Sequence, residues 1–398
     1  MDYSENRIVD YTGDSTIGRG AMDVPFLLLT LLLLVIGVVM VLSASFARAY
    51  YSEGNASYYF TRQLFFALTG IAIMIVASRF PIGFYRRFSG VILLFSIVML
   101  LLVLVGGVKA NGARRWFQIG SITFQPSEIA KIAVILFDAQ LICQYRKQMH
   151  TFRKGVMPLA IVAAFIIGAL ILEPHLSASI IIVLVTATMM FIGGVKLRWF
   201  AAVGGAVAVG GFLAVNVLQY SSERISAWIN PFADTSDTGY QIVQSLYAIG
   251  SGGLNGLGLG GSRQKYLYLP EEHNDFIFSV VCEELGFIGA AVILLLFALL
   301  ICRGFWLAMH CRERYSFLVC TGVTALLAFQ VILNVAVVTN LIPCTGISLP
   351  FFSYGGTALW LQLAEMGVIL SISRDIPEKK FFKERKKKQH EKQSGAVV

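Results

Sequence analysis

Long apolar runs recur along this chain between residues 25 and 373, and they constrain its fold more than any other feature. Two of them, PFLLLTLLLLVIGVVMVLSASFA (25–47) and SGVILLFSIVMLLLVLVGG (89–107), approach the roughly 20 residues that cross a bilayer as a helix. Only a helix satisfies the backbone groups of such a run inside hydrocarbon. Because 57% of the residues are hydrophobic and 14% are charged, against about 25% charged in soluble domains, the sequence predicts a polytopic membrane protein.

The pattern predicts an all-α membrane protein with about ten transmembrane helices and a large extracytoplasmic loop, 219–274, between the seventh and eighth. The expected spans are 25–47, 61–79, 88–107, 126–143, 156–172, 176–193, 199–218, 275–302, 315–341 and 355–373. The polar N-terminal segment, 1–24, precedes a first span without the small-residue cleavage site of a removed signal peptide. We therefore expect a transmembrane domain over 25–374, followed by a basic tail over 375–398.

The distribution of positive charge predicts the orientation. Most of the 32 Lys and Arg residues fall on one side if the N-terminus is inside, which makes both termini cytoplasmic. Much of the net charge of +9 comes from KKFFKERKKKQHEK (379–392), a segment that we expect to meet anionic lipid headgroups rather than nucleic acid. Docking of a cytoplasmic partner is the alternative use of this tail. The chain has no CxxC pair and no HExxH motif, so a protein-built zinc site is not expected.

The outward side holds three distinctive segments, 108–125, 219–274 and 342–354, where function should be sought. In the largest, GYQIVQSLYAIGS (239–251) has the apolar spacing of a short helix at the membrane interface. GLGLGG (256–261) matches the dinucleotide pattern only formally, since it neither follows a strand nor opens a helix, and it predicts flexible or tightly turned backbone. Arg263 and Lys265 follow it and would suit a phosphate, although a solvated basic loop explains them equally well.

Ionisable side chains mark the outer ends of two spans. Pro126 is expected in the first turn of the fourth span, which places Glu128 and Lys131 on one helix face inside the membrane boundary. Such groups are functional candidates by default, and a structural ion pair between helices is the alternative. Glu173-Pro174-His175 joins the next two spans as a proline turn, with the Glu and His either functional or a polar cap.

The stretch YLPEEHNDFIFSVVCEELG (268–286) places Asp275 at the lip of the eighth span. A carboxylate at the boundary between water and lipid is partly desolvated, which raises its pKa and makes it a better base. Glu283 and Glu284 lie about 12 to 13.5 Å deeper along the helix. We expect these two to be interior ties between helices or partners for a buried cation.

The words NGARRW, FQPSEIAK, GYQIVQSLYAIGSGGLNGLGLGGSRQKYLYLPEEHNDFIF and LPFFSYGGTALW resemble the SEDS family of bacterial cell-wall synthesis, which includes FtsW, RodA and SpoVE. The resemblance is collinear from the first span to the last. It implies a ten-helix membrane glycosyltransferase that polymerises lipid II with a class B penicillin-binding protein transpeptidase. It also implies that Asp275 is catalytic and that Arg115, Glu128 and Lys131 line the central cavity.

QKYLYLPEEHNDFIF resembles FtsW and SpoVE more than RodA, which favours division or spore wall over elongation and places the protein in the bacterial inner membrane at the septum, with other divisome proteins. One departure concerns the fifth span, where many relatives have Pro-Asp-Leu-Gly and this chain has Pro174-His175-Leu176-Ser177. A role borrowed for that Asp therefore does not transfer.

The reaction that the resemblance implies needs a base for the acceptor hydroxyl, cations for the undecaprenyl pyrophosphate leaving group, and contacts to two tethered sugars. Asp275 is expected to be the base. The substrate site is expected to include Arg115, Gln125, Glu128, Lys131, Arg263, Lys265, Glu271, His273 and Ser353. A divalent cation such as Mg²⁺ or Mn²⁺, held by Asp275, a glutamate and the phosphates, would serve as well as Lys and Arg. No organic cofactor is indicated.

Two other functions remain at this point. A lipid II flippase would also use polar groups inside a ten-helix bundle, but we find no internal repeat, and the distinctive residues gather at the outer face. A division scaffold would use the spans to organise partners, and it leaves Asp275 and the Glu128/Lys131 pair unexplained.

Overall fold

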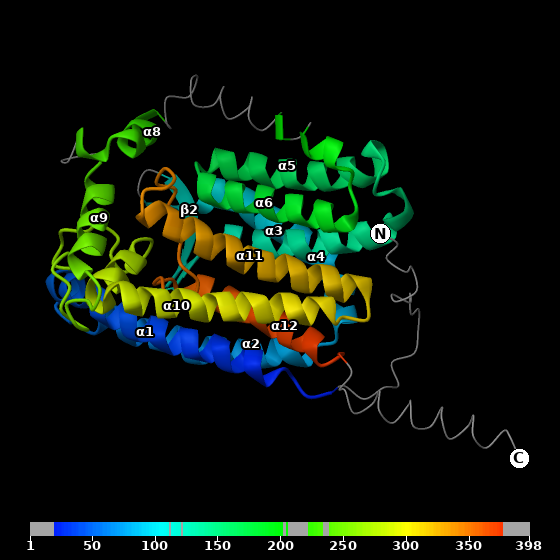
Figure 1. Ribbon diagram of the computed structural model, residues 1–398. Helices are drawn as coiled ribbons and strands as arrows, with labels where there is room; N and C mark the ends of the chain where they lie inside the picture. Colours follow the sequence, from blue (N-terminus) through cyan, green and yellow to red (C-terminus); the bar gives the residue numbers. More distant parts are fainter. Residues whose placement is uncertain are drawn as a thin grey trace, which may run out of the picture.

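The computed structural model describes residues 20–110, 113–120, 122–201, 204–205, 222–233 and 239–376. Long helices lie side by side along one direction, and a cap of loops and short helices covers one end (Figure 1). The long helices are α1 (Val24–Glu53), α2 (Tyr58–Arg79), α3 (Ile82–Gly106), α4 (Pro126–Gln144), α5 (Met157–Leu172), α6 (Leu176–Gly193), α10 (Ile277–Met309), α11 (Arg314–Val338) and α12 (Gly356–Ser373). Shorter helical elements are η1 (Arg146–Gln148), η2 (Phe152–Val156), α8 (Ser222–Ile229), η3 (Pro231–Ala233) and α9 (Tyr240–Gly252).

The predicted membrane architecture is confirmed. Within the described ranges, 8 helices are long and apolar enough to cross a membrane, and α4, which carries three ionisable residues, lies among them as a further long helix. The predicted seventh span, 199–218, falls mostly outside the described residues. So do most of the N-terminal segment, 1–24, and of the basic tail, 375–398, and these boundaries stay predictions.

Both described chain ends lie at the same end of the bundle, opposite the cap. The Asp23 carboxylate accepts a hydrogen bond from the N–H of Phe26 at 2.9 Å and so caps the start of α1. The Asp23 N–H in turn donates to the Ser373 hydroxyl at the end of α12 (3.0 Å).

A small antiparallel sheet follows α3, and the all-α prediction did not include it. Its strands are β1 (Val108–Ala110), β2 (Ala113–Ile119) and β3 (Ile122–Phe124), in the order β1-β2-β3. Val108 pairs with Trp116, and Phe117 pairs with Phe124. The sheet rests on α3 and α12, and the Thr357 hydroxyl donates to the main-chain oxygen of Thr123 at 2.9 Å. It therefore holds Arg115 over the outer end of the bundle.

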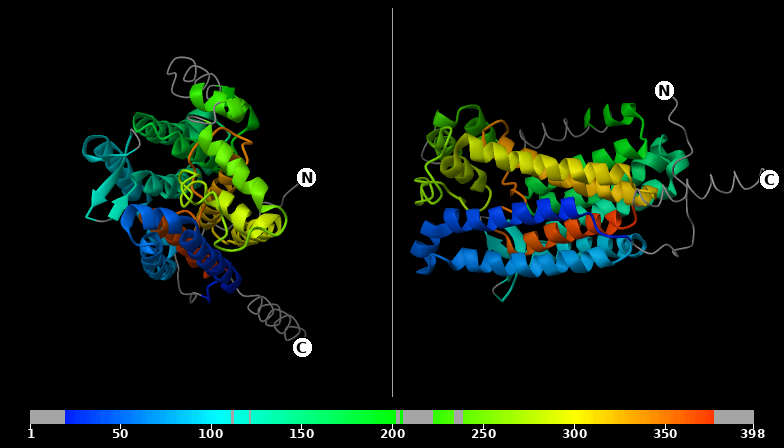
Figure 2. Two further views of the ribbon diagram at one scale, coloured as in Figure 1. Left: turned by 90° about the vertical axis from the view of Figure 1, so that its left-hand side faces the viewer. Right: turned by 60° about the horizontal axis from the view of Figure 1, so that its bottom comes forward.

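The expected interfacial helix is present as α9, which runs across the end of the bundle rather than along it (Figures 1 and 2). Its residues Ile242, Val243 and Ala248 are buried, and it packs against α10. The apolar spacing seen in the sequence is thus the side of the helix that faces the protein.

The longest helix, α10, is broken at Gly286, where φ is +67° and ψ is −172°. The glycine-rich segment after α9 fills the break. Leu257 and Gly258 donate main-chain hydrogen bonds to the oxygens of Glu283 and Glu284, both at 3.0 Å. A Cβ atom on Gly256 would lie 2.2 Å from the oxygen of Glu284, so only glycine permits this approach. The predicted tight turning of GLGLGG is confirmed.

Candidate active site

Asp275 lies in the turn that leads into α10, and the turn is fixed through three consecutive carbonyl groups. The oxygen of His273 accepts from the N–H of Tyr354 (2.8 Å), and that of Asn274 accepts from the Ser353 hydroxyl (2.9 Å). The oxygen of Asp275 accepts from the side-chain amide of Asn334 in α11 (2.8 Å). Two other segments therefore hold the backbone beneath the Asp275 side chain.

The Asp275 carboxylate itself is half-buried, and among the described residues no protein group donates a hydrogen bond to it. Burial raises the pKa of Asp275 to about 7, the charge of Glu271 acts in the same direction, and Arg115 opposes both. The carboxylate lies over Gly346, where an added Cβ would be 3.0 Å from Oδ2. At neutral pH this group can therefore accept a proton readily.

The residues just before Asp275 are held individually. The Asn274 amide donates to the Glu271 carboxylate at 2.5 Å. Glu272 is fully buried and accepts two hydrogen bonds from Arg48 of α1, at 2.7 and 2.8 Å. Although burial alone would raise it, the nearby His273 ring, 3.7 Å away, and the hydrogen bonds from Arg48 lower the pKa of Glu272. This carboxylate is structural, since its charge is already paired.

His273 and Ser353 were both predicted at the substrate site. Both lie at the turn, where their side chains contact other protein groups. The His273 ring stacks against Tyr59 of α2, with 4.6 Å between ring centroids, and lies 5.7 Å from the ring of Tyr354. Ser353 accepts from the N–H of Leu349 (2.7 Å) while it donates to Asn274. The structure thus brings both residues to the site as supports for the catalytic turn.

Arg115 joins Asp275 to a second group of polar residues at the turn between α5 and α6. Its guanidinium donates to the main-chain oxygen of Glu173 at 3.0 Å and to that of Pro174. It is near enough to act electrostatically on Asp275, Glu173 and His175. Of the cations that the sequence predicted at the site, Arg115 is therefore one that acts on the Asp275 carboxylate.

The carboxylate and imidazole of this second group are both neutral near pH 7. Burial raises the pKa of Glu173 to about 8, against the influence of Arg115. Burial, together with the positive charges of Arg115 and Lys131, lowers the pKa of His175 to about 3. His175 Nε2 lies 3.4 Å from the side-chain nitrogen of Gln125, which immediately precedes α4. Both Glu173 carboxylate oxygens and His175 Nδ1 are buried, and no residue in the described part of the chain forms a hydrogen bond with them.

Glu128 and Lys131 form the ion pair that the sequence predicted. Their charged groups are 2.6 Å apart in the first turns of α4, and both side chains are largely buried. Pro126 begins the helix, as expected. Lys131 also acts electrostatically on His175 and on Glu365 of α12. The pair is thus connected to the Arg115 group rather than isolated between two helices.

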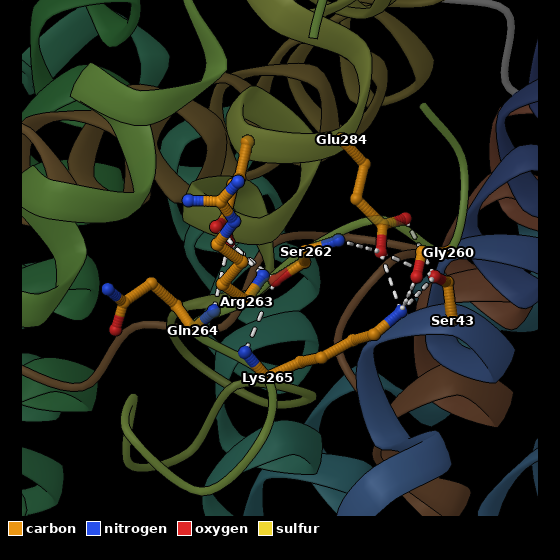
Figure 3. A network of polar contacts seen from close by, with 8 residues as sticks. Ser43, Gly260, Ser262, Arg263, Gln264, Lys265 and Glu284 are labelled. Carbon is orange, nitrogen blue, oxygen red and sulfur yellow. Dashed lines mark hydrogen bonds and ion pairs between the residues drawn. The ribbon is translucent and has the colours of Figure 1, made fainter. Parts of the chain in front are cut away.

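Lys265 and Arg263 are placed differently from the rest of the predicted set. The Lys265 ammonium is buried, donates to the Gly260 oxygen (2.7 Å), and pairs with Glu284 at 3.0 Å (Figure 3). Ser43 of α1 completes this network by donating to the same carboxylate at 2.7 Å. The expectation that Glu284 partners a buried cation is confirmed, while the Arg263 side chain is exposed.

A protein-built metal centre is not formed by the residues that the structure describes, because no three His, Cys, Asp or Glu side chains come together there. The cations near Asp275 are Arg115 and, further along the same group, Lys131.

Sequence reasoning missed three residues that shape the site: Arg48, Asn334 and Glu365. Asn334 and Glu365 are strongly polar side chains inside apolar spans, a pattern that marks functional candidates. That signal was available for both. Arg48 could not be recognised, because nothing in the sequence shows that it meets Glu272 across 224 positions.

Comparisons with known proteins agree with this geometry. The chain matches the family model described as cell cycle protein, FtsW/RodA/SpoVE, over residues 24–377. Stage V sporulation protein E of Bacillus subtilis (strain 168) is 40% identical over 364 residues, which cover 90% of this chain and 99% of that protein. The probable peptidoglycan glycosyltransferase FtsW of Trichlorobacter lovleyi is 38% identical over 358 residues, covering 89% of this chain and 93% of that protein.

Solved structures give the same result. A chain described under "Structural coordination of polymerization and crosslinking by a peptidoglycan synthase complex" has a TM-score of 0.75 at 27% identity, and the match covers 90% of this chain and 99% of that one. The rod shape determining protein RodA of Thermus thermophilus has a TM-score of 0.66 at 27% identity, with the same coverage.

Proposed function

Because the chain belongs to the FtsW, RodA and SpoVE family of cell cycle proteins, we propose that it is a peptidoglycan glycosyltransferase that polymerises lipid II at the outer face of the bacterial cell membrane. One observation carries the proposal: a half-buried carboxyl with a pKa of about 7 stands at the outer lip of the bundle, next to an arginine. A carboxylate with this pKa can remove a proton from a sugar hydroxyl, and the arginine can stabilise a phosphate-bearing leaving group beside it.

In this reaction Asp275 accepts the proton of the GlcNAc 4-hydroxyl. The oxygen then forms a bond to C1 of the MurNAc at the reducing end of the growing strand. The bond from C1 to the undecaprenyl pyrophosphate breaks, and the pyrophosphate leaves with its electron pair. Direct attack inverts the configuration at C1. No second carboxylate is required as a nucleophile, and the neutral Glu173 would be a poor one.

Charge neutralisation of the leaving pyrophosphate falls to Arg115 and Lys131, which share the group around Glu173 and His175. A divalent cation would have to use phosphate oxygens for most of its ligands, and a polymerisation assay with a chelator as one arm tests that requirement. The Arg263 side chain is exposed, so it contributes at the rim.

The test is polymerisation of lipid II by the purified full chain with its transpeptidase partner. Asp275→Asn keeps the shape of the side chain and removes the base, so we expect a loss of about 10²–10⁴-fold in rate with normal expression and thermal stability. Glu53→Gln, an exposed carboxylate beyond the site, should keep the normal rate. A normal polymerisation rate for Asp275→Asn would overturn the assignment.

The same preparation separates synthesis from transport. Polymer formed in detergent, without a membrane to cross, supports the glycosyltransferase. Lipid II that crosses reconstituted vesicles without being polymerised would support a flippase instead.

The finer features of the proposal rest on the relatives. We infer a role in division, since several relatives are named FtsW, and a class B penicillin-binding protein as partner, in keeping with the peptidoglycan synthase complex among the similar structures. Both termini are expected in the cytoplasm, with the basic tail at anionic lipids. Septal localisation of a fluorescent fusion in dividing cells would support the division role, and localisation along the lateral wall would contradict it.

A further inference from the structure

The outer loop carries a neutral, leucine-rich tip. Residues 252–261 read GGLNGLGLGG and contain no charged side chain. Leu254, Leu257 and Leu259 are 67%, 40% and 60% exposed. We call residues 253–259 the leucine tip. Keeping a leucine side chain in water instead of burying it costs about 1.5–3 kcal/mol, so water is a poor environment for this surface.

The leucine tip cannot hide its side chains by refolding, because its backbone is docked on α10. Beyond the break, the N–H groups of Phe287 and Ile288 donate to the oxygens of Gly253 and Leu254, at 2.9 and 3.2 Å. A Cβ atom on Gly286 would lie 2.3 Å from the nitrogen of Gly256. The two segments are therefore in direct backbone contact, and the leucines are presented by a fixed support.

The leucine tip contacts α10 at the break, where the lipid-facing side of this helix begins. Before the break, residues 276–284 are all buried. From the break onward, Phe287 and Ile288 are 67% and 55% exposed, and exposed apolar residues continue at helical spacing along one side, namely Val292, Leu295 and Leu299. Since α10 crosses the membrane, this side faces acyl chains. The leucine tip is continuous with it through the bond between Ile288 and Leu254.

Of the two basic residues that follow the leucine tip, Lys265 is turned inward, whereas the Arg263 side chain is exposed. Lys265 points beneath the tip, where its ammonium is bonded to the Gly260 oxygen and paired with Glu284 (Figure 3). The same carboxylate is bonded to Ser43 of α1, and exposed apolar residues of α1, Val39 and Phe46, lie on either side of that serine along the helix. The apolar surface of α1 thus passes the same level.

We propose that the leucine tip is immersed in the outer leaflet of the membrane, at the boundary between acyl chains and headgroups, where it anchors the outer loop. Ile277 lies about 13.5 Å beyond Gly286 at 1.5 Å per residue. At that spacing the anchor would hold Asp275 outside the hydrocarbon core, on the water side of the lipid headgroups. This consequence rests on the proposed function, whereas the immersion itself does not depend on any reaction.

Lipid quenching of a site-specific fluorophore tests the immersion. The full chain, with its six native cysteines replaced by alanine, is labelled at Leu257→Cys and reconstituted in vesicles of phosphatidylcholine and phosphatidylglycerol with brominated acyl chains. Val292→Cys serves as the site inside the membrane, and Glu53→Cys, at the end of α1, as the site outside it. We expect the probe at Leu257 to lose as large a fraction of its fluorescence as the probe at Val292, while the probe at Glu53 is unaffected.

The unsubstituted chain provides an independent measurement if the cysteine-free chain does not fold. Lipids with a photoreactive group on the acyl chain should label peptides that cover 253–259. Quenching at Leu257 no greater than at Glu53, together with no labelling of those peptides, would overturn the proposal. Protection of the probe only after a second protein is added would also overturn it and make the tip a protein interface. Neither readout uses polymerisation, so failure here leaves the proposed function untouched.

Discussion

Carboxylates lie at both ends of the part of α10 that precedes the break at Gly286, and they differ in burial and in hydrogen bonding. Glu283 and Glu284, at the break, are fully buried, and each accepts several hydrogen bonds, including those from the N–H of Arg263 and from Lys265. Asp275, just before the helix, is half-buried, and no described protein group donates a hydrogen bond to its carboxylate. Glu283 and Glu284 each have several hydrogen-bond partners. The backbone of Asp275 is held by hydrogen bonds, whereas its carboxylate accepts none from the described residues.

The hydrogen bonds that a carboxylate accepts distinguish a structural carboxylate from a reactive one better than its charge or its position alone. A buried carboxylate whose oxygens are all engaged stabilises the fold by its pairing, and it has no capacity left for a substrate proton. The backbone around Asp275 is held by Tyr354, Ser353 and Asn334. Its carboxylate therefore keeps its orientation while both oxygens stay available to a substrate. We expect variants at the break to change stability and variants around the catalytic turn to change rate.

The largest expected effect is on stability, at the break. Glu284→Ala leaves the Lys265 ammonium buried without its partner, which should lower the free energy of unfolding by about 3–5 kcal/mol. Thermal unfolding in detergent measures this loss, with Glu53→Ala as the exposed control. Activity per folded molecule should stay near normal. A stable Glu284→Ala protein with lost activity would instead place Glu284 in the chemistry.

Gly346 should affect both properties, because its conformation and its neighbour are both special. Its φ of +68° is unfavourable for alanine by about 1–2 kcal/mol, and the added methyl group would lie 3.0 Å from Asp275 Oδ2. We expect Gly346→Ala to lose about tenfold or more in polymerisation rate, more than its stability loss explains. Gly54→Ala, at a φ of +67° and with nothing within 4 Å of the new methyl group, is the matched control. Equal rates for the two variants would contradict the placement of Asp275.

The pH dependence should shift in opposite directions at two positions. Glu271 raises the pKa of Asp275 and Arg115 lowers it. Since the base acts only when deprotonated, the rate falls below its pKa. Glu271→Gln should therefore move the acidic midpoint of the rate profile to lower pH, and Arg115→Gln should move it to higher pH, each by up to about one unit. Initial rates at saturating lipid II measure both, and shifts of the same sign would contradict the arrangement.

The smallest effect is expected at Ser353. Ser353→Ala removes one donor to Asn274 and one acceptor from Leu349, which should cost about 1–2 kcal/mol in unfolding free energy. The rate should fall by a few fold with an unchanged pH midpoint, since the carboxylate of Asp275 is not touched. Rescue by Ser353→Thr, which restores the hydroxyl, distinguishes a lost hydrogen bond from general loosening. No change in rate or stability would show that this tie is dispensable.

The sequence predicted the parts of the molecule that follow local rules. Apolar length predicted the spans, Pro126 the start of α4, and the spacing of Glu128 and Lys131 their ion pair. Asp275 was expected at the start of the eighth apolar run, and it lies just before α10. Those features depend on neighbours along the chain, which a sequence displays.

Other features depend on contacts between distant segments, which no local pattern reveals. Lys265 was expected at the phosphates, and the structure places it against Glu284 and Ser43, because the loop folds back under the leucine tip. The strands of the short sheet around Arg115 contain too few residues for their alternating pattern to be recognised in the sequence beside the long apolar spans. Pairing of Arg48 with Glu272 required the three-dimensional arrangement of α1 and α10.

The most direct test of the central claim compares the polymerisation rate of the natural chain and of Asp275→Asn across pH 5.5 to 8.5, at saturating lipid II. If Asp275 is the base, the natural chain gains about tenfold in rate per pH unit below its midpoint near 7, and the asparagine variant is slow with no titration in that range. The claim is contradicted if the variant polymerises at the normal rate, or if it titrates with the same midpoint.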